Sequence, residues 1–406
     1  MGWIGLDDTD SIDGGCTTWD FHLLLTEIEE SGFEVVNSPR LVRLWPFAPE
    51  RTRGNAALSA EVIVDSENED TFIKLIENWF DCRYSIESDW NVLSFHPSLV
   101  WTREQFPEQW YWDGVRGYVD SELRHELINQ IEGVKYWSRG SNRGLVGSTS
   151  SIAWRGLNDW TWEATAWRAD TMIGKDRIVS NSRVIEMSIK FPGTILNRDP
   201  NAGKSLITPR TPCPVLYGIR SEEEIVAKDA HKWLQSDALV ENAVAMRVHR
   251  TNQATGDHII NVENGVVISE LIEVKGGHAS VSVFSNGKKL SLVAFKQGGA
   301  VNSLLRQTVI GDIVEWRGLS CSENEIHLES LMVSDAAPRQ LVRPLCECGN
   351  RFQRQGRDQP LRCSGCSKIT NSLWLGARFD DEGVWKEPVP SHRRHLAKPL
   401  GRQSKR

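Results

Sequence analysis

The chain has 406 residues, of which 40% are hydrophobic and 25% are charged, so it can bury a sizeable core in about two to four domains. Its net charge of -7 excludes a protein that is basic all over, and any surface for nucleic acid must be local. The sequence has no run of about 18 apolar residues and no leader with a basic and then an apolar part, so we expect a cytoplasmic protein without a membrane span.

The first hundred residues alternate between strand-like and helix-like patterns. Residues 3–6 read as a strand, and apolar residues then recur at helical spacing over 21–33, with Thr17 or Thr18 as a plausible N-cap and Gly32 as a plausible stop. The pattern continues with a strand, a second strand of clean alternation and another helix, at 40–44, 58–64 and 72–79. This part of the chain is predicted to be α/β.

The middle of the chain gives weaker signals. Residues 99–135 look helical and polar, and 141–147 ("SNRGLVG") look like a glycine-punctuated loop. We predict a strand over 185–192 and a helix over 222–233.

A different style begins near Gly265. Alternating apolar residues flank Asn286-Gly287, a strong hairpin signal, and 311–318 and 326–333 also read as strands. Several short strands in about 70 residues predict a small barrel of the oligonucleotide-binding (OB) kind.

Three carboxylates, Asp7, Asp8 and Asp10, directly follow the first predicted strand, and Gly14, Gly15 and the predicted helix start at Thr17 come next. Ligands of open α/β sheets lie beyond strand ends, carboxylates hold Mg²⁺, and a glycine-rich turn before a helix holds phosphate. Together these features suit phosphoryl transfer. Residue types alone leave open a solvated turn in which the aspartates only cap the backbone.

Two basic segments need separate treatment. Arg53, in the loop 51–55 with Asn55, could counter phosphate charge or belong to a plain basic loop. Gly203-Lys204-Ser205 resembles the end of a P-loop, but position 198 is arginine where that motif needs glycine, so we reject a P-loop here.

Four cysteines lie close together near the C-terminus: Cys346, Cys348, Cys363 and Cys366. They form C-x-C, then 14 residues, then C-x-x-C, and four thiolates in two pairs predict a structural Zn²⁺ site. The alternative is four unrelated thiols. The tail 389–406 has six Lys or Arg and no acid, so it is either a disordered solvated tail or a contact for an RNA backbone.

Several stretches, in the same order from end to end, resemble the archaeal agmatidine (2-agmatinylcytidine) synthetases. The resembling stretches are "GLDDTDS" (5–11), "GGCTT" (14–18), "PRLVRL" (39–44), "TRGN" (52–55), "RGLVG" (143–147), "TPCPVLYGIR" (211–220), "TNQATGDHI" (251–259), "GGH" (276–278) and "RRHLAKPL" (393–400). The resemblance implies an α/β (α+β) multidomain protein. Its expected parts are a kinase-like ATP domain (1–100, interleaved with part of 140–190), a ferredoxin-like agmatine domain (101–260), an OB-fold barrel (264–336) and a zinc ribbon with the basic tail (340–406).

The resemblance also implies a reaction. Such enzymes join agmatine to C2 of the wobble cytidine of a minor isoleucine tRNA, so that AUA is read as isoleucine. ATP activates the C2 oxygen by phosphorylation and ends as AMP and pyrophosphate. The partners implied are that tRNA and agmatine, and the cofactors are ATP, Mg²⁺ and structural Zn²⁺.

Residue roles follow from the matching positions. Asp7, Asp8 and Asp10 are expected to be catalytic and to hold Mg²⁺, and Thr18 looks like the threonine that becomes phosphorylated. The remaining expected site residues are Gly14, Gly15, Thr17, Arg53 and Asn55 at the ATP phosphates, and Tyr217, Gly218, Ile219 and Glu163 at agmatine. For Glu163, an ion pair with Arg168 is the alternative.

This sequence departs from the family pattern at a few positions. The first cysteine pair is "CEC" where the family has C-P-x-C, and Trp45 and Phe47 replace a polar pair beside the expected ATP site. Two other functions compete with the ligase: a different ATP-dependent RNA-modifying kinase or ligase, and a non-catalytic RNA-binding protein.

Overall fold

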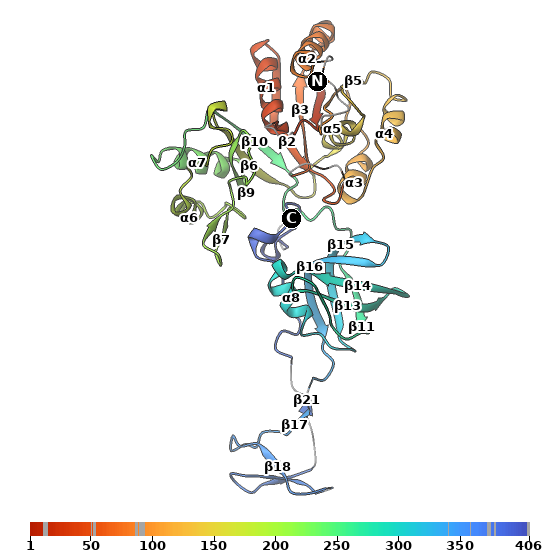
Figure 1. Ribbon diagram of the computed structural model, residues 1–406, viewed down its shortest axis with the longest axis vertical. Coiled ribbons are helices and arrows are strands. Elements are labelled where there is room, and N and C mark those ends of the chain that lie inside the picture. Colours follow the sequence, from red (N-terminus) through yellow and green to blue (C-terminus); the bar gives the residue numbers. More distant parts are fainter. Residues whose placement is uncertain are drawn as a thin grey trace. The chain divides into compact units, whose positions relative to one another are not determined.

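The computed structural model describes residues 1–403, apart from 11–14, 50, 52–53, 86–87, 89–93, 340, 358, 372–374 and 377–378. The chain forms two compact units, Met1–Ile260 with Val389–Arg406, and Asn261–Pro388 (Figure 1). Gly14 and Arg53, both predicted at the ATP phosphates, lie outside the described residues.

The first unit is built on an eight-stranded sheet in the described part of the chain, ordered β5-β4-β1-β3-β2-β10-β6-β9. Its strands are β1 (Gly2–Asp7), β2 (Glu34–Arg43), β3 (Ala56–Ile63), β4 (Ser98–Thr102), β5 (Lys135–Ser138), β6 (Thr161–Trp167), β9 (Val215–Ser221) and β10 (Ala245–Thr251). Neighbouring strands are antiparallel except β2 and β10, which run parallel with Arg40 opposite Arg250. This parallel pair joins the two halves of the sheet into one surface.

Helices cover both faces of the first half of the sheet (Figure 1). Each face of the sheet has its own hydrophobic cluster. One cluster includes α1 (Thr17–Glu30) and α2 (Glu69–Arg83), and the other includes α3 (Gln109–Arg116), α4 (Ser121–Ile128) and α5 (Arg143–Ala153). In the second half, α6 (Asn181–Lys190) and α7 (Glu224–Gln235) pack on β6 and β9, and β7 (Arg198–Asp199) pairs with β8 (Lys204–Ser205). The mixed α/β character predicted from the sequence is confirmed.

Clear periodicity in the sequence produced the elements it predicts. In α1, the four residues at helical spacing (Phe21, Leu24, Leu25 and Ile28) are fully buried against the sheet. Gly32 follows the helix with a φ of 88°, a left-handed conformation that suits glycine at a helix end. The helix over 222–233 and the first three strands are likewise present, as α7, β1, β2 and β3.

The predicted loop over 141–147 is wrong, because α5 begins at Arg143. Its glycines allow a close approach to the sheet rather than a turn. A methyl group at Gly144 would lie 2.8 Å from Ser98 Oγ on β4, and one at Gly147 would lie 1.8 Å from the carboxylate of Asp7. Glycine lowers helix propensity, but here tertiary packing outweighs it.

The predicted strand over 185–192 is wrong. It is helix α6, because Val184 and Met187, three residues apart, are the side chains that pack inward. The predicted helical stretch over 99–135 contains α3 and α4, but it begins with strand β4, which is buried along its whole length between β1 and β5. Lys204 and Ser205 form the short strand β8, so no phosphate-binding helix follows Gly203.

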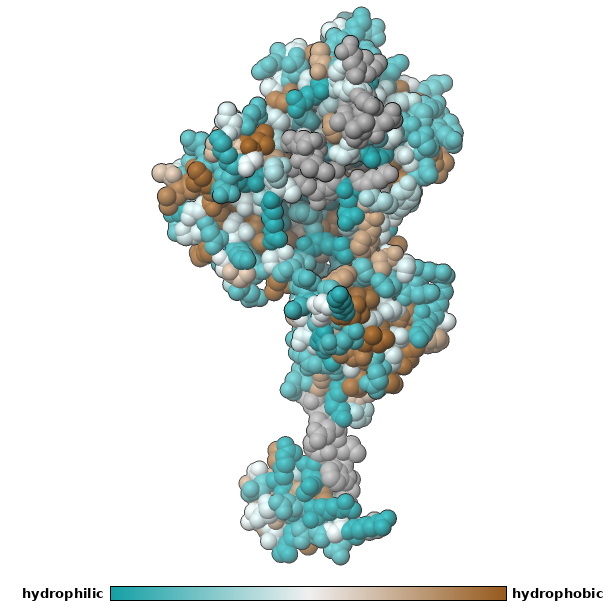
Figure 2. All heavy atoms as spheres, in the orientation of Figure 1, coloured by the Kyte–Doolittle hydropathy of each residue, from teal (hydrophilic) through white to brown (hydrophobic). Residues whose placement is uncertain are grey.

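The second unit contains a small barrel. Its elements are β11 (Glu263–Val267), β12 (Ile272–Val274), β13 (His278–Ser285), β14 (Lys288–Ala294), α8 (Ala300–Leu305), β15 (Ile313–Ser322) and β16 (Glu325–Asp335). The order β11-β15-β16-β14-β13 closes because β13 also pairs with β11, which confirms a five-stranded barrel in the described residues. Asn286 and Gly287 both have positive φ, as the predicted hairpin requires. Figure 2 shows apolar surface on the barrel. Exposed apolar side chains of its strands include Val266, Ile272 and Phe284.

The cysteine segment follows the barrel with very short strands. These are β17 (Leu341–Val342), β18 (Phe352–Arg354), β19 (Leu361–Cys363), β20 (Ile369–Thr370) and β21 (Leu375–Gly376). Among the described helices of the chain, none combines the length and the apolar character that a membrane crossing requires.

Candidate active site and metal centre

The three aspartates at the end of β1 point to different places. Asp8 has a φ of 57°, a left-handed conformation that is costly for a residue other than glycine and that turns the chain sharply after Asp7. Asp10 Oδ1 instead accepts the backbone N–H of Thr17 at 2.8 Å and so satisfies the first turn of α1. Asp7 and Asp8 line a cleft together, whereas Asp10 positions the start of the helix.

The cleft lies between β1, the β2–β3 loop, α5 and the segment after α3, and it is open to solvent. Its charged residues have both signs, with Asp7 and Asp8 facing Arg51 and Arg143, and Trp45 and Tyr118 add aromatic surface. Leu44, Ala48, Pro49, Asn55, Ala56, Gly114, Val119, Ser121, Val146 and Gly147 complete the lining. Paired carboxylates beside two guanidinium groups suit a phosphate chain that carries a cation.

Burial makes both cleft carboxylates poor anions when no cation is bound. Desolvation, and then the neighbouring Asp8 carboxylate, raise the pKa of Asp7 well above its usual range. Desolvation also raises the pKa of Asp8 to about 7, although its ion pair with Arg143, with Nε 2.9 Å from Oδ2, opposes the shift. A cation bound here would relieve this electrostatic penalty.

Replacing Gly147 with alanine is expected to damage the cleft selectively. The added methyl would lie 1.8 Å from Oδ2 and 2.5 Å from Cγ of Asp7, so either the carboxylate or α5 must move. If the cleft binds ATP, as the resemblance implies, the apparent affinity for ATP should fall by roughly 10- to 100-fold. Gly117→Ala is the matched control, because the nearest atom to its methyl would be Asp113 O at 3.9 Å. Equal ATP affinity in both variants would contradict this packing argument.

Cation binding at Asp8 is expected to depend on pH. Its pKa of about 7 in the folded protein exceeds the value near 4 of an unfolded chain. Without a bound metal, the contribution of Asp8 to stability is therefore fully present below about pH 4 and is lost as the pH rises towards 7. Below about pH 7, Mg²⁺ must displace a proton, and the association constant for Mg·ATP should decrease by up to about tenfold per pH unit. Calorimetry in two buffers of different protonation enthalpy measures this proton release, and its absence would show that Asp8 does not bind the cation.

Asn55 lies in the cleft lining, but its side chain is used to shape the loop. Its φ is 43°, and its side-chain amide donates to Trp45 O at 2.8 Å. Its backbone carbonyl accepts a hydrogen bond from the backbone N–H of Leu44. Of the other predicted phosphate contacts, Thr17 and Gly15 lie at the start of α1 and are not part of the cleft lining.

Thr18 lies in the first turn of α1 and contacts the second half of the sheet. Its hydroxyl is 3.1 Å from Cys16 Sγ and accepts the indole N–H of Trp167, the last residue of β6, at 3.2 Å. Burial raises the pKa of Cys16 to about 12, so this neighbour is a neutral thiol. The Thr18 side chain therefore contacts β6, at the junction between the two halves of the sheet.

Glu163 and Gly218 lie side by side on neighbouring strands β6 and β9. A methyl at Gly218 would be 2.5 Å from Glu163 Oε1, so glycine leaves room for this buried carboxylate. Glu163 accepts from the side chains of Thr165 and Gln253. The alternative ion pair with Arg168 is wrong, because Arg168 pairs with Glu241 through bonds of 2.8 and 2.6 Å.

Positive charge surrounds Glu163. Burial lowers the pKa of both Arg43 and Arg220, and the Glu163 carboxylate opposes that shift in each. Arg43 also interacts electrostatically with Asp10, so it connects the start of α1 with the Glu163 region. His395 lies beside Gln253, with Nδ1 3.1 Å from Oε1, and Arg43 together with burial lowers its pKa well below the usual range, so its imidazole is neutral.

Tyr217 and Ile219, predicted at agmatine, point to the opposite face of β9. Both are fully buried in the core beneath α6 and α7. The Tyr217 hydroxyl bonds there to His231 Nδ1 at 3.0 Å and to the side chain of Gln235 at 2.8 Å. Successive residues of a strand face opposite sides, so these two stabilise the core while Gly218 faces Glu163.

Five further residues complete this region and were given no role from the sequence: Arg143, Gly147, Trp167, Gln253 and His395. Four of them belong to the quoted segments 143–147, 251–259 and 393–400. Arg143 and Gly147 line the cleft, whereas Gln253 and His395 lie beside Glu163. Asn252 helps to join the segments, because its side chain bonds to both the backbone N–H and the carbonyl of Arg43. Segment identity could therefore have pointed to them, but only the fold shows which side chains meet.

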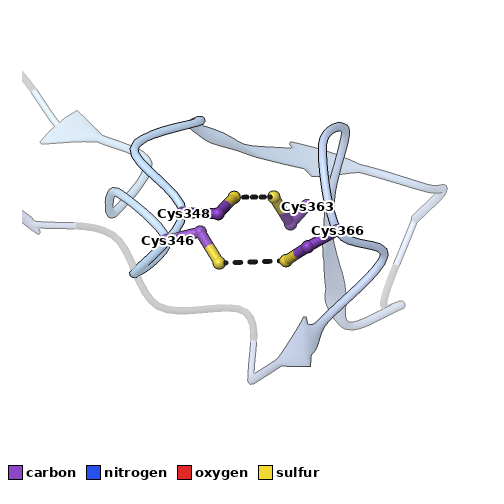
Figure 3. A group of neighbouring side chains, drawn as sticks. All are labelled: Cys346, Cys348, Cys363 and Cys366. Carbon is purple, nitrogen blue, oxygen red and sulfur yellow. Dashed lines mark hydrogen bonds between the residues drawn. The ribbon is translucent and has the colours of Figure 1, made fainter.

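The four C-terminal cysteines form a second, separate centre (Figure 3). All four Sγ atoms lie within 4.8 Å of one another, with Cys346–Cys366 and Cys348–Cys363 pairs at 3.4 Å. These separations are too long for disulfides and close to the ~3.8 Å edge of a tetrahedral zinc–thiolate site. The alternative of four unrelated thiols is wrong, and the shortened C-x-C half brings its sulfurs to the same point.

The basic tail packs against the first unit through residue 403, so its disordered alternative is wrong for 389–403. Arg402 is buried and pairs with Asp159 at 3.0 Å and Glu222 at 2.8 Å, and Lys398 pairs with Asp159 at 2.8 Å. Backbone bonds join the carbonyls of His395 and Leu396 to the segment after β10. The tail thereby brings His395 to the Glu163 region.

Comparison with known proteins identifies the chain. A TiaS TCKD domain model matches residues 3–78, and a TiaS FLD domain model matches residues 142–258. The isoleucine-tRNA 2-agmatinylcytidine synthetase TiaS of Methanopyrus kandleri is 30% identical over 432 aligned positions, which cover 98% of this chain and 96% of that protein. The chain belongs to the isoleucine-tRNA 2-agmatinylcytidine synthetase (TiaS) family. The resemblance seen in the sequence is confirmed.

Solved TiaS structures share this fold over nearly the whole chain. A complex of TiaS with its isoleucine tRNA and ATP superposes with a TM-score of 0.81 at 27% identity, and a complex with the tRNA, AMPCPP and agmatine with 0.80 at 25%. Each match covers 99% of this chain and 97% of the other. In this TiaS-family chain, α5 falls within the FLD match yet packs on β1 and β3 of the TCKD match. Strands of both matched parts belong to one sheet.

Proposed function

We propose that this chain uses ATP to join agmatine to C2 of the wobble cytidine of the minor isoleucine tRNA, which forms agmatidine and lets AUA be read as isoleucine. The observation that carries the proposal is the end-to-end match to TiaS, including a complex with its isoleucine tRNA, AMPCPP and agmatine. The convergence of the shared segments around the cleft and Glu163 supports it.

ATP would bind in the cleft with its phosphates towards Arg51 and Arg143. Asp7 and Asp8 would hold Mg²⁺, which proteins usually bind through one or two carboxylates together with substrate phosphates. Two carboxylates are therefore enough to bind Mg²⁺ here. Asp10 instead holds the first turn of α1 in place, and with it Thr18. Bound Mg²⁺ would offset charge on the transferring phosphoryl group.

The chemistry needs activation because the C2 carbonyl of cytosine is a poor electrophile. Phosphorylation of its oxygen creates a leaving group, and the agmatine amine then forms the new C–N bond as the C2–O bond breaks. For the phosphates to balance, ATP would end as AMP and two phosphates, rather than as the AMP and pyrophosphate that the resemblance implies. One phosphate carries the C2 oxygen away when the amine attacks and loses its proton, and water releases the other. Thr18 would carry the phosphorylation seen in the resembling family. The target base must leave its stack to reach these groups.

Agmatine would bind near Glu163, whose buried carboxylate fits closely against Gly218. A guanidinium ion forms its strongest bonds with carboxylates, and Glu163 is a buried carboxylate on this face of the second half of the sheet. Arg43 and Arg220 already interact with this carboxylate, so agmatine would have to compete with them for its charge.

Glu163→Gln separates two roles for this carboxylate. If it binds agmatine, the KM for agmatine should rise by roughly 10- to 100-fold, which corresponds to loss of a charge-assisted hydrogen bond. Exposed Glu223→Gln is the control. An unchanged KM together with a lower melting temperature would show that Glu163 only neutralises Arg43 and Arg220.

The finer domain assignments are also proposals. Residues 1–100, with α5 from the 140–190 region, would form the kinase-like ATP domain, and 101–260 the ferredoxin-like agmatine domain. The five-stranded barrel over 264–336 would be an OB-fold, and 340–406 would comprise a zinc ribbon and the tail. The cysteine set fits zinc because four converging thiolates match its tetrahedral preference, and the tiny core of Phe352 and Leu361 needs such a crosslink. The barrel and ribbon would hold the tRNA by shape and backbone contacts.

The test is transfer of labelled agmatine to tRNA. Purified chain, ATP, Mg²⁺ and an isoleucine tRNA transcript with a wobble cytidine should give labelled tRNA. A transcript with uridine at that position is the matched control and should remain unlabelled. Failure to label the cytidine transcript under conditions where a known TiaS does so would overturn the proposal.

A further inference from the structure

A second group of metal-type ligands lies on the barrel, away from the four-cysteine centre. Cys321 is at the end of β15, and Glu325 and His327 are at the start of β16. One ligand atom of each lies within 4.8 Å of the others. Glu325 Oε1 is 3.2 Å from Cys321 Sγ and 3.0 Å from His327 Nε2.

The hairpin backbone brings these three side chains together. Glu325 and His327 are two residues apart on one strand, so they share a face. On the other strand, Ser320 pairs with Ile326 and Ser322 pairs with Glu325, so Cys321 is an extra residue in a β-bulge. Leu319 pairs with His327, so strand alternation places Cys321, two residues further on, on the face of the sheet that Glu325 and His327 share. The bulge leaves Cys321 without a paired residue of its own on the other strand.

Packing against an aromatic ring orients the imidazole of His327. The ring of His327 packs edge-on against Phe295, with centroids 4.7 Å apart, and Phe295 packs in the same way against His278 at 5.1 Å. Cys321 is exposed, so an ion can reach the group from solvent. A ring oriented by packing and an accessible thiol are both features that metal sites use.

The three types of ligand atom in this group favour zinc. Thiolate, imidazole and carboxylate are the three ligand types of protein zinc sites, and bond lengths of about 2.0–2.3 Å place neighbouring ligand atoms about 3.3–3.6 Å apart. The two observed separations lie just below that range, so only small side-chain movements are needed. Three protein ligands leave a fourth position for water, an arrangement that closed structural sites lack.

We propose that Cys321, Glu325 and His327 form a second zinc site, with an open fourth position, that closes the tip of the β15–β16 hairpin. The site is independent of the four-cysteine centre and of the ligase reaction. Its ion would crosslink the two strands where the bulge interrupts their pairing.

Zinc content of the full-length chain tests the proposal. Reduced protein is stripped of metal, reloaded with Zn²⁺ alone, desalted and measured by mass spectrometry. The unmodified chain should retain about two ions, and Cys321→Ser and His327→Asn about one each. Cys82→Ser, which removes an exposed thiol elsewhere, should retain about two. If Cys321→Ser binds as much zinc as the unmodified chain, the proposal is wrong.

A second variant tests the proposed site without the four-cysteine centre. It carries serine in place of all four of those cysteines and should retain about one zinc per chain; the positions are Cys346, Cys348, Cys363 and Cys366. Co²⁺ added to this variant should give a thiolate-to-cobalt absorption band that disappears when Cys321→Ser is added. No band in the fourfold variant would overturn the site, whatever the total zinc count.

Discussion

Asp8→Asn is expected to abolish agmatine transfer, with a fall in kcat/KM on the order of 10³-fold. Asparagine can still accept the Arg143 bond that Asp8 makes, so the turn after β1 should persist. It cannot supply the negative charge that would hold Mg²⁺ beside the phosphates. The loss should therefore lie in the chemical step and in Mg·ATP binding, not in tRNA affinity.

Three measurements on Asp8→Asn show which step the substitution affects. Single-turnover transfer, Mg·ATP affinity and tRNA affinity are compared with those of Asp70→Asn, which removes an exposed carboxylate from the first turn of α2. Asp70→Asn should match the unmodified chain in all three. If Asp8→Asn retained full transfer activity, the cleft could not be the ATP site.

Thr18→Val is expected to slow the reaction by at least about 10³-fold, because it keeps the shape of threonine but removes the hydroxyl that would be phosphorylated. Thr18→Ser should retain activity within roughly tenfold. Valine also leaves the Trp167 indole N–H without its acceptor, which costs about 1–3 kcal/mol of stability. Loss of activity must therefore be separated from loss of folding.

Thr26→Val is the matched control for that separation. It makes the same substitution two turns later in α1, where the hydroxyl donates only to His22 O. Phosphate incorporation from labelled ATP, followed by peptide mapping, shows whether Thr18 is modified. An active Thr18→Val enzyme with normal stability would eliminate Thr18 from the mechanism.

Sequence pattern was sufficient where one periodicity dominated. The buried stripe of α1 and the alternating strands around Asn286-Gly287 were both readable, because each element buries one face and exposes the other. The pattern failed for α5, where glycines at 144 and 147 resemble a turn. Their reason is the closeness of Ser98 and Asp7, which are remote in sequence.

The roles of the candidate site residues stay predictions, but the structure shows where each of them lies. Asp7 and Asp8 line the cleft and Glu163 is buried beside Gly218, whereas Asp10 caps α1, and Tyr217 and Ile219 face the core. A segment match identifies a strand, whereas the facing residue depends on which helices cover it. The order of β2, β10 and β6 in the sheet decides this, and local sequence does not encode that order.

The most direct measurement is the ratio of ATP products to agmatine incorporated. Purified chain is incubated with labelled ATP, Mg²⁺, labelled agmatine and the wobble-cytidine tRNA, and AMP, ADP and labelled tRNA are counted in one reaction. The proposed ligase should form about one AMP for each agmatine attached and little AMP without agmatine. ATP cleavage that proceeds equally without agmatine, with no label in the tRNA, would contradict the ligase and favour a kinase-like enzyme with a different acceptor.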